Sequence, residues 1–215
     1  VGESWVPSFT SIILLILSYL TGAFPSAVWY GRTFYNVDVR EYGSGNAGAT
    51  NTFRVLGKNA GIPVLFMDVF KGWLSVNYIF LINSSNVFSP ELLFENQLAF
   101  GIAAVIGHLF PIYTGFRGGK GIATMLGLLI GLQPYAAFFS LIVFVIILFV
   151  FRYVSLASMI ASLAFPFFVM IILSSTNEPL NLFAIFVPIL SLITHQKNIE
   201  RLIRKEETKV KFGKK

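Results

Sequence analysis

Seven apolar segments, separated by short polar stretches, occupy most of this 215-residue chain. A helix needs about 20 apolar residues to cross a bilayer, with a range of roughly 17 to 25, and most of these segments have that length. Charged residues make up only 12% of the chain, whereas soluble domains carry roughly 25%. The sequence therefore predicts an all-α integral membrane protein, with helices at residues 8–31, 60–82, 92–113, 121–132, 135–151, 154–173 and 180–194.

The positions of Lys and Arg predict how these segments cross the membrane. If all seven cross with the N-terminus outside, every Lys and Arg except Lys71 lies on the cytoplasmic side, as basic residues usually do. The segment 121–132 is short, but if it did not cross, Arg152 and the basic C-terminal tail would change sides. We therefore expect a bundle of about seven transmembrane helices with a cytoplasmic C-terminus, and a single multi-pass membrane domain over residues 1–215. The stretch after Ser8 lacks the positive region of a signal peptide, so we expect an uncleaved helix there.

Two glycine-rich polar clusters interrupt the apolar pattern. The first cluster is GSGNAGATN at residues 43–51, and the second cluster is FRGGKG at residues 116–121. Each lies just before an expected helix, where free backbone N–H groups can bind phosphate. Both fall on the expected cytoplasmic side. Because irregular polar backbone is costly in a membrane protein unless it lines a site, the clusters point to function.

The side chains of the clusters suit an anionic ligand. In the first cluster the glycines allow the backbone to approach a ligand closely, and Ser44, Asn46, Thr50 and Asn51 add donors, with Arg54 one turn beyond. The second cluster lacks the spacing of an ATP-binding phosphate loop, but it places Lys120 among three glycines, with Arg117 adjacent. The alternatives are a glycine-rich turn with helix-capping residues, and a flexible basic loop at the head-group boundary.

Other polar residues stand at helix ends or inside a helix. Asp68 and Lys71 are three residues apart and could pair, either as an intramembrane functional site or as a pair that only neutralises itself. His108 and Ser155 lie at helix ends, where a structural role is common. His195 and Asn198 share a face if the last helix continues, although a solvated helix end is the simpler interpretation.

Several kinds of chemistry are disfavoured. The chain has no Cys, which excludes disulfides and thiolate chemistry, and no His-Glu-x-x-His spacing, so we expect no metal and no cofactor. The net charge of +6 could indicate nucleic acid, but the positions of the charges indicate a cytoplasmic face that meets anionic substrates. The open alternatives are an enzyme, or a transporter of phosphate-bearing anions. The expected outside loops carry no cation that would receive such an anion.

Together these regions resemble the bacterial membrane glycerol-3-phosphate acyltransferases that use acyl phosphate, the PlsY family. The likeness rests on the first cluster, GHLFPIYTGFRGGKG at 107–121, RYVSLAS at 152–158 and HQKNIERL at 195–202. Arg117 stands where members commonly carry Lys, which keeps the charge. The resemblance implies a multi-pass enzyme of the inner (cytoplasmic) membrane, with its active site on the cytoplasmic face.

The resemblance also implies the reaction. An acyl group passes from acyl phosphate to the 1-hydroxyl of sn-glycerol 3-phosphate, giving lysophosphatidic acid and phosphate, in the first step of phospholipid synthesis. The upstream partner would be a soluble enzyme that makes acyl phosphate. The implied catalytic residues are Ser44, Arg54, Lys120, Ser155, His195 and Asn198, and we expect phosphate binding at Gly43, Gly45, Asn46, Thr50, Asn51, Gly118, Gly119 and Gly121.

The chemistry fits these residues. Acyl phosphate is a reactive mixed anhydride, so the reaction needs neither a covalent nucleophile nor a metal. The hydroxyl proton could pass to the substrate phosphate or to His195, and this choice stays open. We expect the acyl tail in a groove lined by Phe and Leu that opens to lipid.

Overall fold

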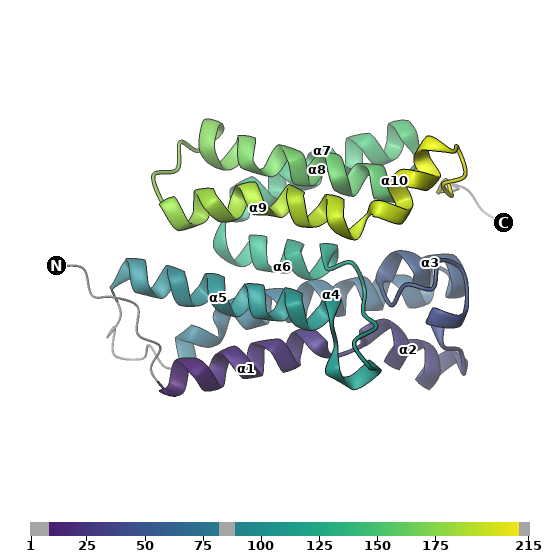
Figure 1. Ribbon diagram of the computed structural model, residues 1–215, viewed down its shortest axis with the longest axis horizontal. Helices are drawn as coiled ribbons and strands as arrows, with labels where there is room; N and C mark the ends of the chain where they lie inside the picture. The colour runs from purple at the N-terminus through teal and green to yellow at the C-terminus, as the bar shows by residue number, and fades with distance from the viewer. Residues whose placement is uncertain (1–8, 82–88, 211–215) are drawn as a thin grey trace. The chain divides into compact units, whose positions relative to one another are not determined.

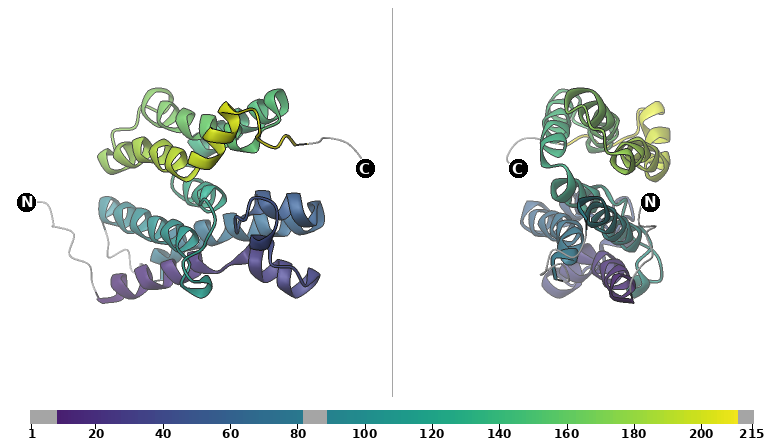
Figure 2. Two further views of the ribbon diagram at one scale, coloured as in Figure 1. Left: turned by 45° about the vertical axis from the view of Figure 1, so that its right-hand side comes forward. Right: turned by 90° about the vertical axis from the view of Figure 1, so that its left-hand side faces the viewer.

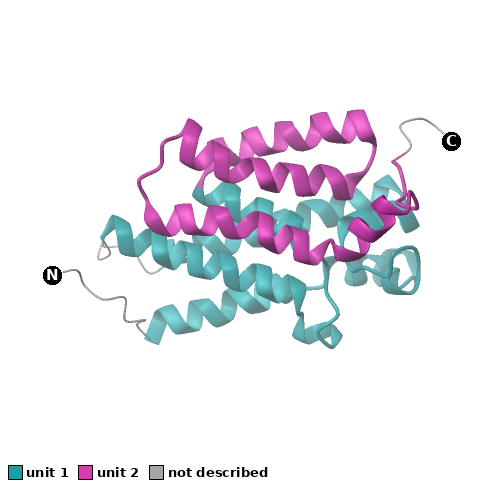
Figure 3. Cartoon of the chain, turned by 45° about the horizontal axis from the view of Figure 1, so that its top comes forward, with its two compact units in different colours: residues 1–132 teal, residues 133–215 magenta. Residues whose placement is uncertain are grey.

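The computed structural model describes residues 9–81 and 89–210, and every regular element in these ranges is helical (Figure 1). The chain divides into two compact units, residues 1–132 and 133–215 (Figure 3). The single domain expected over residues 1–215 stays a prediction.

The described part of the first unit contains six α-helices and three short 3-10 helices. In chain order these are α1 (Phe9–Ala23), α2 (Ser26–Tyr35), η1 (Val39–Glu41), α3 (Ala49–Leu56), α4 (Lys58–Asn77), η2 (Tyr78–Leu81), α5 (Pro90–Leu109), η3 (Ile112–Thr114) and α6 (Ile122–Leu132). The described part of the second unit contains α7 (Pro134–Phe151), α8 (Val154–Phe167), the π-helical turn η4 (Phe168–Ile172), α9 (Glu178–Thr194) and α10 (Gln196–Ile203).

The prediction of an all-α chain with membrane-length apolar helices is confirmed. In the described ranges four helical segments are long and apolar enough to cross a membrane, or six if each of two bent pairs is one span. The helix α6 is a shorter apolar helix of 11 residues. The number of crossings and their directions stay predictions.

The first expected helix, residues 8–31, is two helices in the structure. The chain breaks after Ala23, and α1 and α2 meet at 44° (Figure 2, purple). Pro25 explains the break, because it has no N–H to donate and disfavours helical backbone at the residue before it. A second bend, of 63°, separates α9 from α10.

Glycines bring the helices of the first unit close together. The helix α1 packs against α4 and α5, and α6 packs against the same two helices. A Cβ at Gly72 would overlap the backbone carbonyl of Thr124, and one at Gly127 would overlap that of Val69. Small residues at such contacts are typical of helix packing in membranes. In the second unit α8 contacts both α7 and α9.

Candidate active site

The first cluster forms a loop that leads into α3 and is held by Asn51. This side chain is 1% exposed. Its oxygen accepts the N–H of Ser44 over 2.9 Å, and its nitrogen donates to the carbonyls of Val39 and Tyr42 over 2.7 and 3.1 Å. Gly43 has a φ of +62°, and a Cβ there would overlap Asn51 Oδ1. Asn51 therefore fixes the shape of the loop, and its expected contact with substrate stays a prediction.

The other polar side chains of this region are more accessible. Ser44 and Asn46 are half-buried, while Thr50 and Arg54 are exposed. Arg54 lies in the last turn of α3, and its side chain passes beside the loop, since a Cβ at Gly43 would lie 3.4 Å from Arg54 Cδ. The alkyl part of the Arg54 side chain therefore lies beside the loop at Gly43, the residue before Ser44.

The second cluster lies between η3 and α6. Gly119 donates its N–H to the carbonyl of His108 over 3.1 Å, and Gly121 has a φ of +80° just before α6 begins. Half-buried Lys120 stands between these two residues. The Gly119 N–H therefore already has an acceptor. The N–H groups in the first turn of α6 have no acceptor within the helix, and they are the better candidates for phosphate.

A cluster of buried ionisable side chains lies beneath this segment. Lys71 Nζ is 2.9 Å from Asp68 Oδ1, which confirms the predicted pair. His108 Nδ1 lies 3.6 Å from the same oxygen, and Lys71 also donates to the carbonyl of Phe24 over 3.0 Å.

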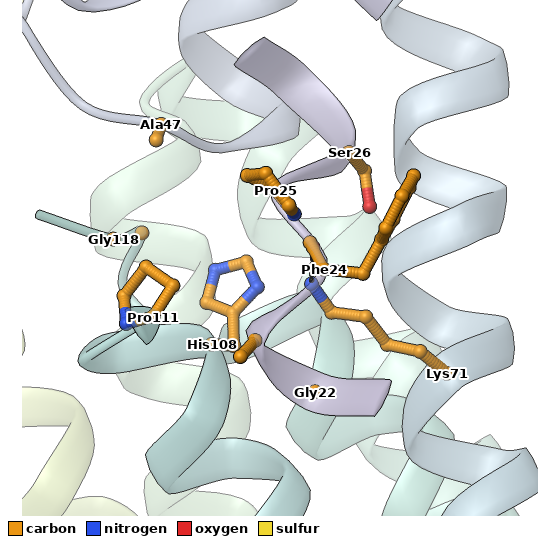
Figure 4. Close-up of a pocket in the computed structure, with 11 residues that line it drawn as sticks. Gly22, Phe24, Pro25, Ser26, Ala47, Lys71, His108, Pro111 and Gly118 are labelled. Atoms are coloured by element: carbon orange, nitrogen blue, oxygen red, sulfur yellow. Dashed lines mark hydrogen bonds between the residues drawn. The ribbon is translucent and has the colours of Figure 1, made fainter. Parts of the chain in front are cut away.

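A small pocket brings the two clusters together within the first unit (Figure 4). Ala47 from the first cluster and Gly118 and Gly119 from the second line it, beside Lys71 and His108. Its volume of about 10 Å³ leaves room for roughly one water molecule. The two clusters therefore border one pocket, which as it stands is too small for a phosphate. Their expected position on the cytoplasmic side stays a prediction.

An ion-pair cluster links the loops that carry the two clusters. Arg40 donates to the carboxylate of Asp38, with Nη2 2.8 Å from Oδ2, and also to the carbonyl of Thr114 over 3.3 Å. Arg32 reaches the same carboxylate over 2.8 Å. The hydrogen bond from Arg40 lowers the pKa of Asp38 to about 2, and the carboxylate in turn raises the pKa of Arg40.

The second unit holds Ser155, His195 and Asn198, the remaining catalytic residues that the sequence predicts. All three are buried. Ser155 lies in the first turn of α8, and its hydroxyl makes no hydrogen bond within the described residues. His195 occupies the bend between α9 and α10, and Asn198 lies in the first turn of α10. The last helix therefore does not continue straight through His195.

Two contacts orient these side chains. His195 Nδ1 lies 2.7 Å from the carbonyl oxygen of Ser191, which fixes the proton on Nδ1 and makes Nε2 the acceptor nitrogen of a neutral ring. Asn198 Nδ2 donates to both carboxylate oxygens of Glu207 over 3.1 Å.

The segment after α10 returns to the start of α8. Val210 donates its N–H to the carbonyl of Arg152 over 2.7 Å, and Lys209 Nζ lies 5.3 Å from the centre of the Tyr153 ring. These contacts hold the segment that carries Glu207.

Comparison with known proteins decides the family. A family model described as Glycerol-3-phosphate acyltransferase matches residues 12–205. The chain belongs to this family. It is 42% identical over 209 residues to the glycerol-3-phosphate acyltransferase of Enterococcus faecalis, with 94% of this chain and 93% of the relative covered. It is 41% identical over 201 residues to that of Staphylococcus aureus strain Newman, with 94% and 98% covered.

Solved structures agree with this family. The crystal structure of PlsY (YgiH), an integral membrane glycerol 3-phosphate acyltransferase, in its glycerol 3-phosphate form has a TM-score of 0.79 at 34% identity, covering 94% of this chain and 96% of that one. The lysophosphatidic acid form has a TM-score of 0.78 at 33% identity, with the same coverage. This chain is thus a glycerol-3-phosphate acyltransferase that makes lysophosphatidic acid, and the transporter alternative is wrong.

Sequence reasoning missed two features of this acyltransferase. Arg40 is not among the residues that the sequence analysis singles out, yet it links the loops of the two clusters. The short spacing of Asp38 and Arg40 in a chain with few charges was the available signal. His108 was taken as a residue at a helix end, and its contact with Asp68 joins α5 to α4, which spacing along one helix cannot show.

Proposed function

We propose that this acyltransferase uses acyl phosphate as its donor and acylates the 1-hydroxyl of sn-glycerol 3-phosphate. The supporting observation is the pair of glycine clusters that line one pocket, each beside a cation. Two sites of this kind suit two substrates that each carry a phosphate. A soluble enzyme that produces acyl phosphate would act just upstream.

The reaction needs one bond to form and one to break. The hydroxyl oxygen of glycerol 3-phosphate attacks the acyl carbon, the bond from that carbon to the phosphate oxygen breaks, and phosphate leaves. The hydroxyl proton passes to the departing phosphate, whose second pKa lies near 6. His195 is the alternative base, and the Nδ1-protonated ring described above supports it, because Nε2 can then accept a proton.

The described contacts suggest how the phosphates are held. We assign one phosphate to Lys120 and the backbone of residues 118–121. Because the Gly119 N–H is already bonded to His108, the N–H groups at the start of α6 take its place as phosphate donors. Arg54 and Ser44 take the other phosphate. Charge-assisted bonds of this kind also stabilise negative charge that develops on the leaving group. His195 and Asn198 orient glycerol 3-phosphate.

An apolar groove in the first unit is a candidate for the expected acyl groove. It has a volume of about 210 Å³ and is lined by Thr21, Phe24, Phe66, Met67, Phe70, Lys71 and Leu74. Phe24 and Lys71 also line the small pocket between the clusters. An acyl chain in this groove would therefore end next to that pocket. Leu74→Trp, which narrows the groove, should shift the preferred donor toward shorter chains.

We place the enzyme in the inner (cytoplasmic) membrane with its active site on the cytoplasmic face. The positions of Lys and Arg support this orientation and seven crossings. Labelling of single cysteines, introduced into the naturally cysteine-free chain at 32 and 197, with a membrane-impermeant reagent tests it. Both should react only after the cells are opened, and reaction in intact cells would reverse the orientation.

Purified protein with acyl phosphate and glycerol 3-phosphate tests the reaction itself. We expect phosphate and lysophosphatidic acid in equal amounts. Acyl-CoA and acyl carrier protein should be poor donors, because cations that bind phosphate stabilise a thiol leaving group only weakly. Turnover should survive exhaustive chelation. Comparable rates with acyl-CoA would falsify the donor assignment, and loss of activity with EDTA that one divalent ion restores would overturn the metal-free reaction.

A further inference from the structure

Three ionisable side chains are buried in the first unit: those of Asp68, Lys71 and His108. None of them binds a phosphate or moves a proton in the proposed reaction. Their side chains are only 1%, 6% and 5% exposed. Replacing a buried charged cluster with apolar residues of similar volume often leaves a protein equally stable. A contribution to stability is therefore a weak explanation for the presence of charged residues at these positions. Ionisable groups in membrane segments usually serve function.

The cluster contacts two pieces of backbone that border the pocket. Lys71, from α4, donates to the carbonyl of Phe24, where α1 ends. His108, in the last turn of α5, accepts the N–H of Gly119 at its carbonyl. Figure 4 shows the His108 ring standing between Phe24 and Gly118. The charged cluster therefore ties the break between α1 and α2 to the second cluster.

The His108 ring also fills the space beside the second cluster. A Cβ at Gly119 would overlap His108 Nε2, and a Cβ at Gly118 would overlap the His108 carbonyl oxygen. The chain at these two glycines thus rests directly on His108. Lys120 is the next residue in the chain. The position and direction of its backbone therefore depend on where the His108 ring lies.

We infer that Asp68, Lys71 and His108 are positioning residues for acyl transfer. Asp68, which is paired with Lys71, holds the His108 ring, and His108 holds residues 118–120 so that Lys120 meets a substrate phosphate. This role needs no contact with a substrate phosphate, although Lys71 also lines the apolar groove described above. This inference rests on the proposed function, because it takes Lys120 as a phosphate ligand.

A double variant separates positioning from mere stabilisation. Asp68→Leu with Lys71→Met removes both charges together, so that neither is left buried without the other. We expect thermal stability close to that of the wild type. The KM for the substrate whose phosphate Lys120 holds should rise at least tenfold, with a smaller change in kcat, because a displaced Lys120 weakens binding in the ground state.

A conservative variant and a control complete the experiment. Asp68→Asn with Lys71→Met keeps a polar oxygen at the position that lies 3.6 Å from His108 Nδ1, and should recover most of the lost affinity. Asn96 is another buried polar residue of α5, 2% exposed and about 18 Å from His108 along the helix. Asn96→Leu should leave KM unchanged. His108→Phe keeps a ring beneath Gly119 but loses the polar contact of Nδ1 with Asp68. It should raise KM even if the double variants fail to fold.

The outcomes are distinct. A folded Asp68→Leu/Lys71→Met protein whose KM is within about twofold of the wild-type value overturns the inference. So does an Asp68→Asn/Lys71→Met protein whose KM rises as much as that of the first double variant. An unchanged KM in His108→Phe overturns it as well. If Lys120→Ala itself has normal kinetics, the phosphate role of Lys120 fails and the inference fails with it. If Lys120→Ala is impaired while the cluster variants are normal, only the inference fails.

Discussion

Arg40 Nη1 donates to the carbonyl oxygen of Thr114 over 3.3 Å, across 74 positions of sequence. The first residue belongs to the loop before the first cluster, and the second belongs to η3, just before the second cluster. Asp38 holds the guanidinium in place through hydrogen bonds to Nε and Nη2. The two loops that carry the proposed phosphate sites are therefore joined through one arginine side chain.

Arg40→Lys should lower catalytic efficiency although it keeps the charge. A single ammonium group cannot bond the Asp38 carboxylate through two nitrogens and also reach Thr114. Loss of a charge-assisted bond is worth about 1.5–3 kcal/mol, so we expect roughly a tenfold to hundredfold drop in kcat/KM. Arg32→Lys is the matched control, because the Arg32 side chain is 62% exposed and its ion pair should contribute little. Equal effects of the two substitutions would contradict the role of Arg40.

Asp38 predicts a pH dependence of stability with a definite sign. Its folded pKa of about 2 lies below its ordinary value of 3.8, so its contribution is fully present above about pH 4 and is lost as the pH falls toward 2. The difference in thermal unfolding midpoint between the wild type and Asp38→Asn should be constant from about pH 5 to 7 and shrink steeply as the pH falls through 2. A difference that persists undiminished at pH 2 would count against this assignment.

Lys120→Ala tests the proposed phosphate ligand. It removes a charge-assisted contact worth about 1.5–3 kcal/mol, so catalytic efficiency should fall by roughly tenfold to a hundredfold or more. Insertion should be unaffected, because other basic residues still mark the same side. Steady-state kinetics on detergent-purified protein, checked for monodispersity and thermal stability, make the measurement. Normal kinetics in a stable variant would remove Lys120 from the site.

Gly127→Ala should destabilise the first unit more than Gly131→Ala, one turn along the same helix. The added Cβ at Gly127 would overlap the backbone carbonyl of Val69, whereas at Gly131 it would lie 2.9 Å from a side-chain atom of Val76. Because backbone cannot move aside as a side chain can, we expect a cost of about 1–3 kcal/mol at Gly127 and less at Gly131. Thermal unfolding of the two proteins compares them, and the reverse order would refute the packing argument.

The helices were largely predictable from the sequence because apolar length is a strong signal in a membrane chain. The expected helix at 135–151 differs from α7 by one residue. Breaks were harder to predict: Pro25 splits the first segment, yet Pro63 and Pro188 lie inside α4 and α9 without ending them. Whether a proline breaks a helix depends on what neighbouring helices can supply to the freed carbonyl, and that is a tertiary property.

The site was predictable in its parts but not in its connections. The glycine clusters were visible because their composition contrasts with the apolar segments around them. The sequence could not show that Asn51 and the Gly119 N–H are engaged within the protein, because their partners, Val39, Tyr42 and His108, are identified only by the path of the folded backbone. A donor that is free in a sequence pattern can already be occupied in the fold.

The bond between Asn198 and Glu207 has a consequence for how the enzyme is made and destroyed. Glu207 follows every apolar segment in the sequence, so the carboxylate that orients Asn198 is made after all of the helices that it serves. A protease that cuts after Ile203 would likewise leave every apolar segment in the bilayer while removing the group that orients Asn198. The amount of enzyme in the membrane would then not report its activity.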